Sequence, residues 1–325
     1  MKQNSMHLPV IGLALALAMP LAAPAQSYPV KPIRMTVTVP AGGAADVCAR
    51  MLTPKMGESL GQPIVVENNA GMFGSIAAER VSRSAPDGYN LLFTTPSSTI
   101  VIFFQKKVVP YKLSDFTPIT AAVETVTTIV VNPSVPATTL KELIDYAKRY
   151  PGKLTYGTPG IGSTFHLMAE AFMHDAGINM LHVPYKGVIL AVNDLVGGQI
   201  NVALSAVNNV RASVTSGKLR VLAVLEGQRY SGLPNVPTVG EVVPNYEKPA
   251  SWFALFGPAG MPRPITQRLY SEMVKVLKTP DIQSKLEAGG MTIVGNTPDE
   301  FAASIAKGYQ VYGAVYKAAK LQPED

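Results

Sequence analysis

The chain has 325 residues, of which 47% are hydrophobic and 15% are charged, and its formal net charge is +6. The basic residues are scattered, so we expect mild attraction for anions and not a nucleic-acid-binding surface. The single cysteine, Cys48, excludes an internal disulfide, and no Cys/His spacing is typical of a metal site. We therefore predict neither a bound metal nor a cofactor.

Residues 1–25 are typical of a secretory signal peptide. The stretch 8–21 is apolar but too short to span a membrane, and Ala23-Pro24-Ala25 fits a cleavage site. The residue directly after that site is Gln26 and not a cysteine, which argues against a lipid anchor. No later stretch offers the ~18 uninterrupted apolar residues of a membrane span. We expect an exported, soluble, periplasmic monomer, long enough for two domains.

The first half of the mature chain repeats one pattern of strand, loop and helix. A predicted strand at 33–39 leads through a Pro/Gly loop at 40–46 into a helix that ends at Leu60. A second strand at 64–68 is followed by a glycine-containing loop at 69–75 and a helix. A third strand ends in the hydroxyl-rich residues 94–99. Ligands of α/β sheets bind beyond the carboxyl ends of strands, so these loops are candidate site elements.

In the second half, the strand pattern predicts that the chain crosses into another domain and later returns to the first. Strands at 116–122 and 127–131 flank the crossing, and a strong strand at 251–257 is expected to lead the chain back. Between them, strands alternate with helices, and three helices close the chain. This alternation predicts an α/β protein with mostly parallel sheets.

The glycine-rich loop at 157–164 predicts an anion site. It follows a short strand and precedes a helix, for which Ser163 or Thr164 is a good N-cap. The first turn of a helix has unpartnered N–H groups and the positive end of the helix dipole. A nucleotide-cleaving P-loop is excluded because Ser163 stands where the motif requires lysine.

Together, these segments resemble the periplasmic solute-binding proteins of tripartite tricarboxylate transporters, the Bug family. The resemblance runs from about Tyr28 to the last helix, and its specificity lies in the order and spacing of many short motifs. These are Tyr28-Pro29-Val30-Lys31-Pro32-Ile33-Arg34, Pro40-Ala41-Gly42-Gly43-Ala44-Ala45-Asp46, Val65-Val66-Glu67-Asn68, Pro86-Asp87-Gly88-Tyr89, Asp115-Phe116-Thr117-Pro118, Pro151-Gly152-Lys153-Leu154-Thr155-Tyr156-Gly157, His182-Val183-Pro184-Tyr185-Lys186-Gly187, Gly217-Lys218-Leu219-Arg220 and Pro237-Thr238.

The resemblance implies a type II-like periplasmic binding protein fold, with two domains joined by two crossing strands. We expect residues 26–123 with 250–325 to form domain 1 and residues 124–249 to form domain 2. It also implies a carboxylate ligand, gripped from opposite sides by the loops at 40–46 and 157–164, and transporter subunits as partners. The candidate ligand-binding residues are Ala41, Gly42, Gly43, Asp46, Thr94, Ser97, Ser98, Gly160, Gly162, Ser163, Thr164, His166, Tyr185 and Ser205.

Departures from the family pattern leave the ligand open among di- and tricarboxylates, aromatic carboxylates and acidic amino acids. Residues 94–99 are mostly hydroxyls where the family often has glycines, Asn69 replaces a usual arginine, and Ser205 replaces a common aspartate. The lost aspartate favours a ligand with two carboxylates and no ammonium group. Asp46 either points into the cleft or stabilises the first turn of its helix.

The sequence leaves two alternative functions. Ser163 and His166 are neighbours on one predicted helix and could serve a periplasmic hydrolase. A hydrolase also needs an orienting acid and an oxyanion hole, and no G-x-S-x-G elbow is present, so we predict no catalytic residues and no enzyme. The other alternative is a binding protein that delivers its ligand to a sensor or receptor.

Overall fold

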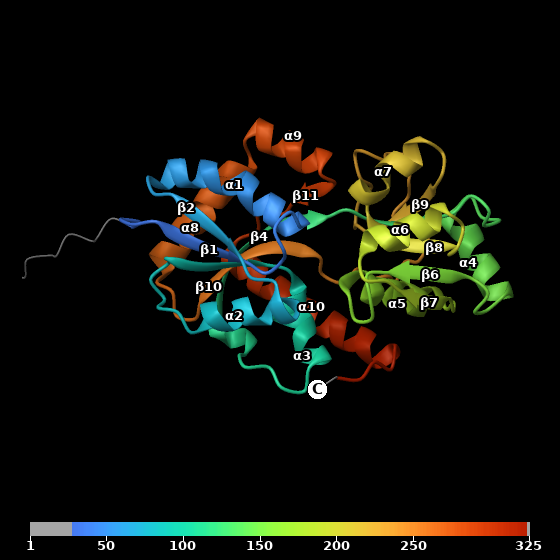
Figure 1. The fold of residues 1–325 in the computed structure, drawn as a ribbon, viewed down its shortest axis with the longest axis horizontal. Coiled ribbons are helices and arrows are strands. Elements are labelled where there is room, and N and C mark those ends of the chain that lie inside the picture. Colours follow the sequence, from blue (N-terminus) through green and yellow to red (C-terminus); the bar gives the residue numbers. More distant parts are fainter. Residues whose placement is uncertain (1–27, 324–325) are drawn as a thin grey trace, which may run out of the picture.

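The computed structural model describes residues 28–323, which form two α/β lobes side by side (Figure 1). The predicted signal peptide lies outside the described residues. Lobe 1 is built on the six-stranded sheet, which contains β1 (Ile33–Val37), β2 (Ile64–Asn68), β3 (Asn90–Thr94), β4 (Phe116–Thr125), β10 (Trp252–Pro258) and β11 (Met291–Ile293). Lobe 2 is built on the five-stranded sheet, which contains β5 (Thr127–Val131), β6 (Thr155–Thr158), β7 (Leu181–Pro184), β8 (Val202–Ala206) and β9 (Arg220–Val224).

Most strands of each sheet run in one direction, as the prediction of mostly parallel sheets requires, but each sheet also contains antiparallel strands. In lobe 1, β1 pairs in parallel with β2 and β3, whereas β10 runs antiparallel to β3 and β4. In lobe 2, β6 pairs in parallel with β7 and β8, whereas β5 runs antiparallel to β8 and β9. The reason is the connection between lobes: β5 carries the chain away from lobe 1, and β10 carries it back.

The crossings make the parallel strands of both lobes end at facing edges. β5 starts two residues after β4 ends and runs into lobe 2, so β8 and its parallel neighbours run back toward lobe 1. β10 returns from lobe 2, so β3 and its parallel neighbours run toward lobe 2. The two predicted crossing connections are therefore present.

Helices cover both faces of each sheet. They are α1 (Ala44–Leu60), α2 (Ser75–Ser82), α3 (Ile102–Gln105), α4 (Leu140–Arg149), α5 (Thr164–Ala176), α6 (Val188–Val196), α7 (Val207–Thr215), α8 (Arg263–Leu277), α9 (Pro280–Ala288) and α10 (Pro298–Ala318). On β3, Leu91 and Phe93 join the core under α1 and α8, whereas Leu92 joins the core under α2 and α10. This alternation is the period of two that a strand buried on both faces requires.

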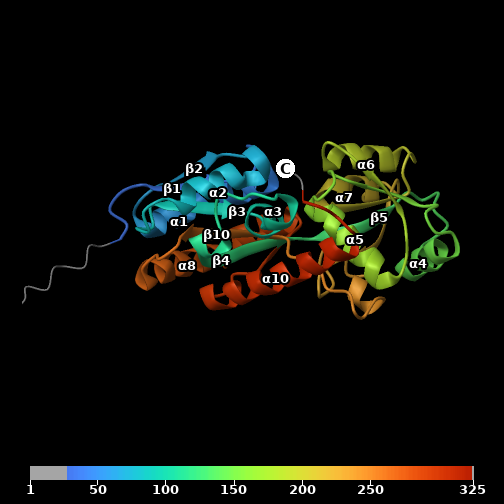
Figure 2. The same cartoon turned by 90° about the horizontal axis from the view of Figure 1, so that it is seen from below.

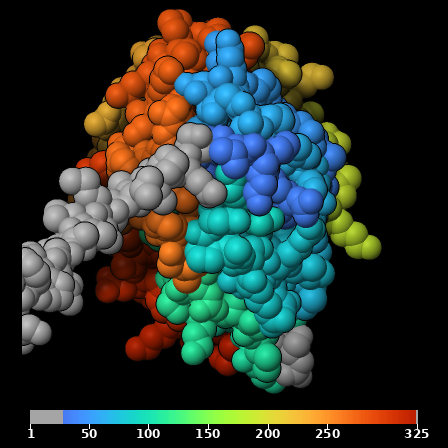
Figure 3. All heavy atoms as spheres, turned by 90° about the vertical axis from the view of Figure 1, so that its left-hand side faces the viewer, coloured from blue at the N-terminus to red at the C-terminus, as the bar shows by residue number. Residues whose placement is uncertain are grey.

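Lobe 1 is assembled from both ends of the chain. Figure 3 shows its outer surface, where residues from the first part of the chain (blue to green) lie beside residues from the last part (orange to red). In lobe 2, α4 and α5 pack on one core, and α6 and α7 pack on the other. No helix within residues 28–323 is long and apolar enough to cross a membrane.

Helix α10 connects the lobes. Its first half packs in lobe 1 through Phe301 and Ile305, and its last turns bring Tyr312 and Val315 into one apolar cluster with Leu167 of α5. Figure 2 shows α10 running beneath lobe 1 and reaching α5. The lobes therefore share a buried apolar contact through α10 and α5.

Candidate ligand site between the lobes

Several helices begin at the facing edges without a side-chain cap. Within the described chain, the N-cap residues Gly43 of α1, Gly74 of α2, Gly187 of α6 and Ala206 of α7 make no side-chain capping hydrogen bond. By contrast, Thr139 caps α4, which begins elsewhere in lobe 2. Uncapped first turns leave amide N–H groups available to an anion, as the loop chemistry predicts.

The loop before α1 is held by the carboxylate of Asp46, which is 3% exposed. Its oxygens accept hydrogen bonds from the N–H of Gly42 (2.8 Å), Nδ2 of Asn68 (2.8 Å) and Nε of Arg50 (2.9 Å). Burial alone would raise the pKa of Asp46, but these hydrogen bonds and the Arg50 charge outweigh it and lower the pKa. Of the two predicted roles, the contacts support the structural one, while Ala41 and Gly42 are left exposed.

The hydroxyls after β3 largely bond to one another. Thr94 is fully buried, and its Oγ1 lies 2.8 Å from Oγ1 of Thr38 and 2.5 Å from Oγ of Ser98. Ser98 is also fully buried, and its carbonyl accepts a 2.6 Å bond from the Tyr111 hydroxyl. Ser97 is half-buried. Residues 97–105 are helical, which the sequence interpretation missed because it assigned these hydroxyls to a loop.

The loop before α5 is held from both lobes. Ser163 caps the helix, and its Oγ accepts a 3.3 Å bond from the His166 N–H. The N–H of Gly162 donates to Nδ1 of His166 at 3.0 Å, and its carbonyl accepts a 2.8 Å bond from Nε2 of Gln105. Gln105 belongs to α3 of lobe 1, and sequence reasoning gave no signal for it. Thr164 and Gly160 are half-buried at the same loop.

His166 is a buried, neutral loop anchor. Its side chain is 5% exposed, and its ring stacks on His182 with 4.1 Å between centroids. Burial and then the neighbouring His182 lower the pKa of His166 to about 4. Nδ1 is occupied by the Gly162 N–H, and Nε2 lies 3.6 Å from Glu170. Ser163 accepts from the His166 backbone and not from its ring, so these residues do not form a nucleophile–base pair.

Two further predicted residues support lobe 2 from within. The Tyr185 hydroxyl donates a 2.7 Å bond to Asp194, and burial together with this bond raises the pKa of Tyr185 to about 12. Ser205 is fully buried; its hydroxyl donates to the Ala206 carbonyl and accepts from Asn209, both at 3.3 Å. A direct ligand contact for either residue stays a prediction.

Exposed apolar side chains stand on both edges, and sequence reasoning did not identify them. In lobe 1, Met72 and Phe73 follow β2 and are 62% and 52% exposed. In lobe 2, Ile161 is 61% exposed beside the glycine loop. Phe73, Gln105, Ile161 and Gly162 line one small cavity between the lobes. The signal available in the sequence was the run Gly71-Met72-Phe73-Gly74, in which bulky residues interrupt a glycine turn.

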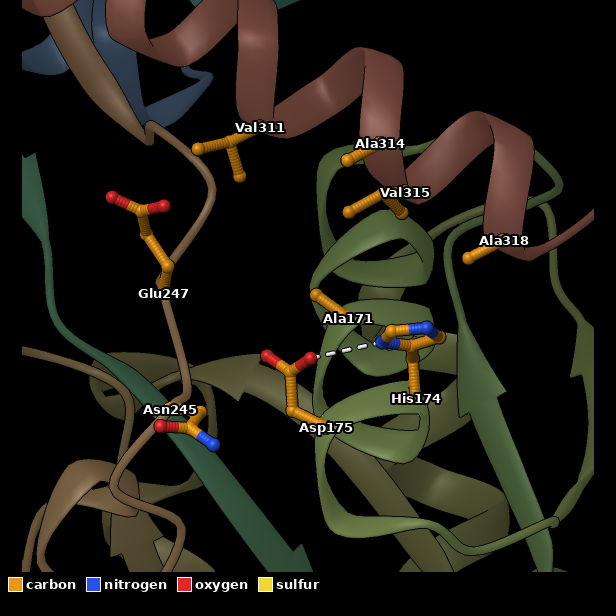
Figure 4. A pocket seen from close by; sticks show the side chains of 9 residues that line it. All are labelled: Ala171, His174, Asp175, Asn245, Glu247, Val311, Ala314, Val315 and Ala318. Carbon is orange, nitrogen blue, oxygen red and sulfur yellow. Dashed lines mark hydrogen bonds and ion pairs between the residues drawn. The ribbon is translucent and has the colours of Figure 1, made fainter.

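A second cavity between the lobes lies at the other end of α5. Figure 4 shows it between α5, α10 and the connection that leads to β10, with Ala171, Val315 and Glu247 among its lining residues. His174 and Asp175 also line it and are joined by a 2.9 Å hydrogen bond. None of the predicted site residues lines this cavity. Among the described residues, no cluster of His, Cys, Asp and Glu could hold a metal ion.

The comparisons with known proteins decide the family. The family described as "Tripartite tricarboxylate transporter family receptor" matches residues 48–321. The chain belongs to this family. BugT of Bordetella pertussis is 35% identical to the chain, over 97% of this chain and 98% of BugT. The resemblance inferred from the sequence motifs is confirmed.

Solved family structures share the fold. An R. palustris protein solved with adipate is 30% identical, with a TM-score of 0.78 over 91% of this chain and 100% of that one. The periplasmic binding protein BugD is 30% identical, with a TM-score of 0.73 over 91% of this chain and 100% of BugD. The predicted two-domain binding-protein fold is confirmed. The family consists of solute-binding receptors, so the hydrolase alternative is excluded and the chain is a binding protein, not an enzyme.

Proposed function

We propose that this protein is a periplasmic receptor that captures a small carboxylate between its lobes and delivers it to a membrane transporter of the tripartite tricarboxylate type. The observation that carries the proposal is the pair of facing glycine loops, which open α1 in lobe 1 and α5 in lobe 2. Helix N-termini attract carboxylates through their free amides and dipole. Adipate in the related R. palustris structure supports a dicarboxylate or another small carboxylate as the ligand.

The proposed site has contact groups and anchoring groups. Contacts come from loop residues and hydroxyls that are not fully buried, at Ala41, Gly42, Gly43, Ser97, Gly160, Ser163 and Thr164. The predicted contact residue Gly162 is buried and both its N–H and its carbonyl are already bonded, so in this proposal it shapes the loop. Anchors hold these loops through the internal bonds described above, at Asp46, Thr94, Ser98, His166, Tyr185 and Ser205. In this arrangement no arginine pair is needed, because the carboxylate replaces its water shell with fixed amides and hydroxyls.

Ligand capture closes the lobes in this proposal. Residues 26–123 with 250–325 move as one domain, and residues 124–249 move as the other. Hinge closure around a ligand is the common response of two-domain binding proteins. Small-angle scattering should give a smaller radius of gyration when a verified ligand is added. An unchanged radius at saturating ligand would contradict closure.

Calorimetry tests the ligand class. A thermal-shift screen of carboxylates comes first, because a ligand that binds only the folded state raises its stability. Isothermal titration then compares the best dicarboxylate with its mono-amide and with the matching amino acid. We expect the dicarboxylate to bind most tightly, since Ser205 leaves no acidic side chain at that position for an ammonium group. Equal or tighter binding of the amide or the amino acid would rule out a dianion site.

Delivery to a transporter requires its own experiment. Uptake of the radiolabelled ligand into cells should require both this protein and the membrane subunits of a tripartite tricarboxylate transporter. Uptake that persists without the protein, combined with a lost transcriptional response to the ligand, would instead support delivery to a sensor.

A further inference from the structure

The turn between β2 and α2 holds two large apolar residues in a backbone conformation that favours glycine. Met72 has φ 48° and ψ 58°, and Phe73 has φ 56° and ψ 24°. Left-handed backbone is costly for side chains of this size, and such outliers persist mainly at functional sites. The residues on either side, Gly71 and Gly74, are glycines. The presence of Met72 and Phe73 at two positions where glycine would be unstrained points to a function that offsets the cost of the strain.

Packing fixes the turn in place. A Cβ at Gly74 would lie 2.5 Å from Cβ of Thr38, at the end of β1. A Cβ at Gly71 would lie 2.5 Å from Cδ1 of Ile76, in the first turn of α2. The backbone around Phe73 thus lies directly against the end of β1 and the start of α2. The backbone that carries the 52% exposed Phe73 side chain is therefore closely packed.

Phe73 lies beside the loop that we propose holds the carboxylate. It lines the small cavity between the lobes together with Gly162 and Ile161 of lobe 2. The other residues that line this cavity are Gln105, Lys106, Tyr316, Leu321 and Gln322. Ile161 is itself 61% exposed, so an apolar side chain from each lobe borders this space. A ligand carboxylate at the first turn of α5, next to Gly162, would place the rest of the ligand near these two side chains.

We propose that Phe73 is a specificity-determining residue that selects carboxylates with an apolar body, an unsubstituted chain or ring, over hydroxylated ones. The inference rests on the proposed carboxylate-binding function and names the substrate class. Burying apolar ligand surface against the Phe73 ring removes that surface from water, which makes the binding free energy more favourable. A hydroxyl on the part of the ligand that faces Phe73 and Ile161 would lose its water without gaining a partner from these two side chains, which costs binding free energy.

The test is titration calorimetry with matched ligand pairs. Adipate is compared with 3-hydroxyadipate, and cyclohexanecarboxylate with its 4-hydroxy derivative. We expect the wild type to bind the unsubstituted member of at least one pair about tenfold more tightly. In Phe73→Ala the preference should shrink toward unity, mainly through an affinity loss of about tenfold for the unsubstituted ligand. Val65→Ala, which trims a 49% exposed side chain on β2, is the matched control and should keep the preference.

Phe73→Gly separates selection from folding. Glycine accepts positive φ without strain, so its melting temperature should equal or exceed that of the wild type, while its ligand preference is lost. Equal affinity losses for both members of a pair in Phe73→Ala would show that Phe73 only contacts lobe 2 on closing, and would overturn the inference. Tighter wild-type binding of the hydroxylated members would overturn it too. If no carboxylate binds the wild type, the proposed function itself fails.

Discussion

The side chain of Gln105 in lobe 1 donates a 2.8 Å hydrogen bond to the carbonyl oxygen of Gly162 in lobe 2. The N–H of the same glycine donates to His166, so side chains from both lobes hold one peptide unit of the proposed ligand loop. Gly162 has φ +72°, and a Cβ there would collide with Nε2 of Gln105. Loop geometry and lobe arrangement are therefore linked at this residue.

A double-mutant cycle measures this link. Gly162→Ala should lower the free energy of unfolding by about 1–3 kcal/mol, since it combines left-handed strain with a steric clash. In a Gln105→Ala background the same substitution should cost less, because the clash disappears and only the strain remains. Urea unfolding of the four proteins gives the coupling free energy. An identical cost in both backgrounds would show that the two residues do not touch in solution.

The cap of α5 serves both the helix and the ligand in our proposal. Ser163→Ala should lower stability by about 1 kcal/mol through loss of the cap, and weaken carboxylate binding about tenfold through loss of a hydroxyl. Thr139→Ala is the matched control, because Thr139 caps α4 in the same lobe with a bond to the Glu142 N–H. It should cost similar stability and leave affinity unchanged. Calorimetry measures the affinity of each variant, and thermal melts measure its stability. Equal affinities in the two variants would contradict a ligand role for Ser163.

The buried His166 predicts a pH dependence of stability. Its pKa in the folded protein, about 4, lies below the ordinary histidine value of 6.5, so the folded state favours the neutral ring. This contribution is fully present above pH 6.5 and is lost as the pH falls from 6.5 toward 4, where the unfolded chain binds the extra proton. A shift of this size corresponds to roughly 3 kcal/mol.

The measurement is the free energy of unfolding between pH 7 and pH 4. His166→Asn keeps an acceptor near the Nδ1 position but removes the titrating ring, so its pH slope should be shallower than that of the wild type. His174→Asn alters a histidine on the same helix whose side chain is 65% exposed, and it should keep the wild-type slope. A wild-type slope in His166→Asn would place the pH dependence on other groups.

A buried ion cluster joins the two crossings. Nζ of Lys248, on the return connection, lies 3.2 Å from Glu124 at the end of β4 and 2.8 Å from Glu226 after β9. The Lys248 side chain is 11% exposed. Burial lowers the pKa of Lys248, but the attraction of the two carboxylates outweighs it and the pKa is raised. Lys248 therefore keeps its charge, and its two ion pairs tie lobe 1, lobe 2 and the return connection together.

Removing the central charge should be costly. Lys248→Met leaves two carboxylates close together, of which Glu226 is only 10% exposed, and we expect a loss of about 3 kcal/mol of stability. Adding Glu226→Gln should recover part of this loss, because it removes one of the two uncompensated charges. Denaturant unfolding checks both variants. If Glu226→Gln makes the Lys248→Met protein less stable, the ion cluster is not the cause.

The N-terminus provides a test of export. Cleavage after Ala25 should leave a mature protein that begins at Gln26, a prediction from the apolar stretch and the Ala23-Pro24-Ala25 site. Mass spectrometry of the periplasmic fraction would detect this end. An intact Met1 in the exported protein would refute it.

The sequence determined the order of the elements and the positions of the glycine loops. Strands, turns and caps depend on neighbours in the chain, so the β1–α1 and β6–α5 units were predictable from residues 33–60 and 153–176. The crossing between β4 and β5 was also predictable, because the strand patterns at 116–122 and 127–131 follow each other closely in the sequence. The mixed sheets were not, since pairing direction depends on how the crossings fold back.

The tertiary structure decided what the polar side chains do. Asp46, Thr94 and Ser205 looked available for a ligand, but each bonds to other groups of its own lobe. Gln105 gave no sequence signal, because its partner Gly162 lies 57 positions away. Hydrogen-bond partners distant in the chain are set by packing of the whole fold, which local propensity does not contain. For the same reason the exposed ring of Phe73, held in a strained turn between the lobes, became visible only in three dimensions.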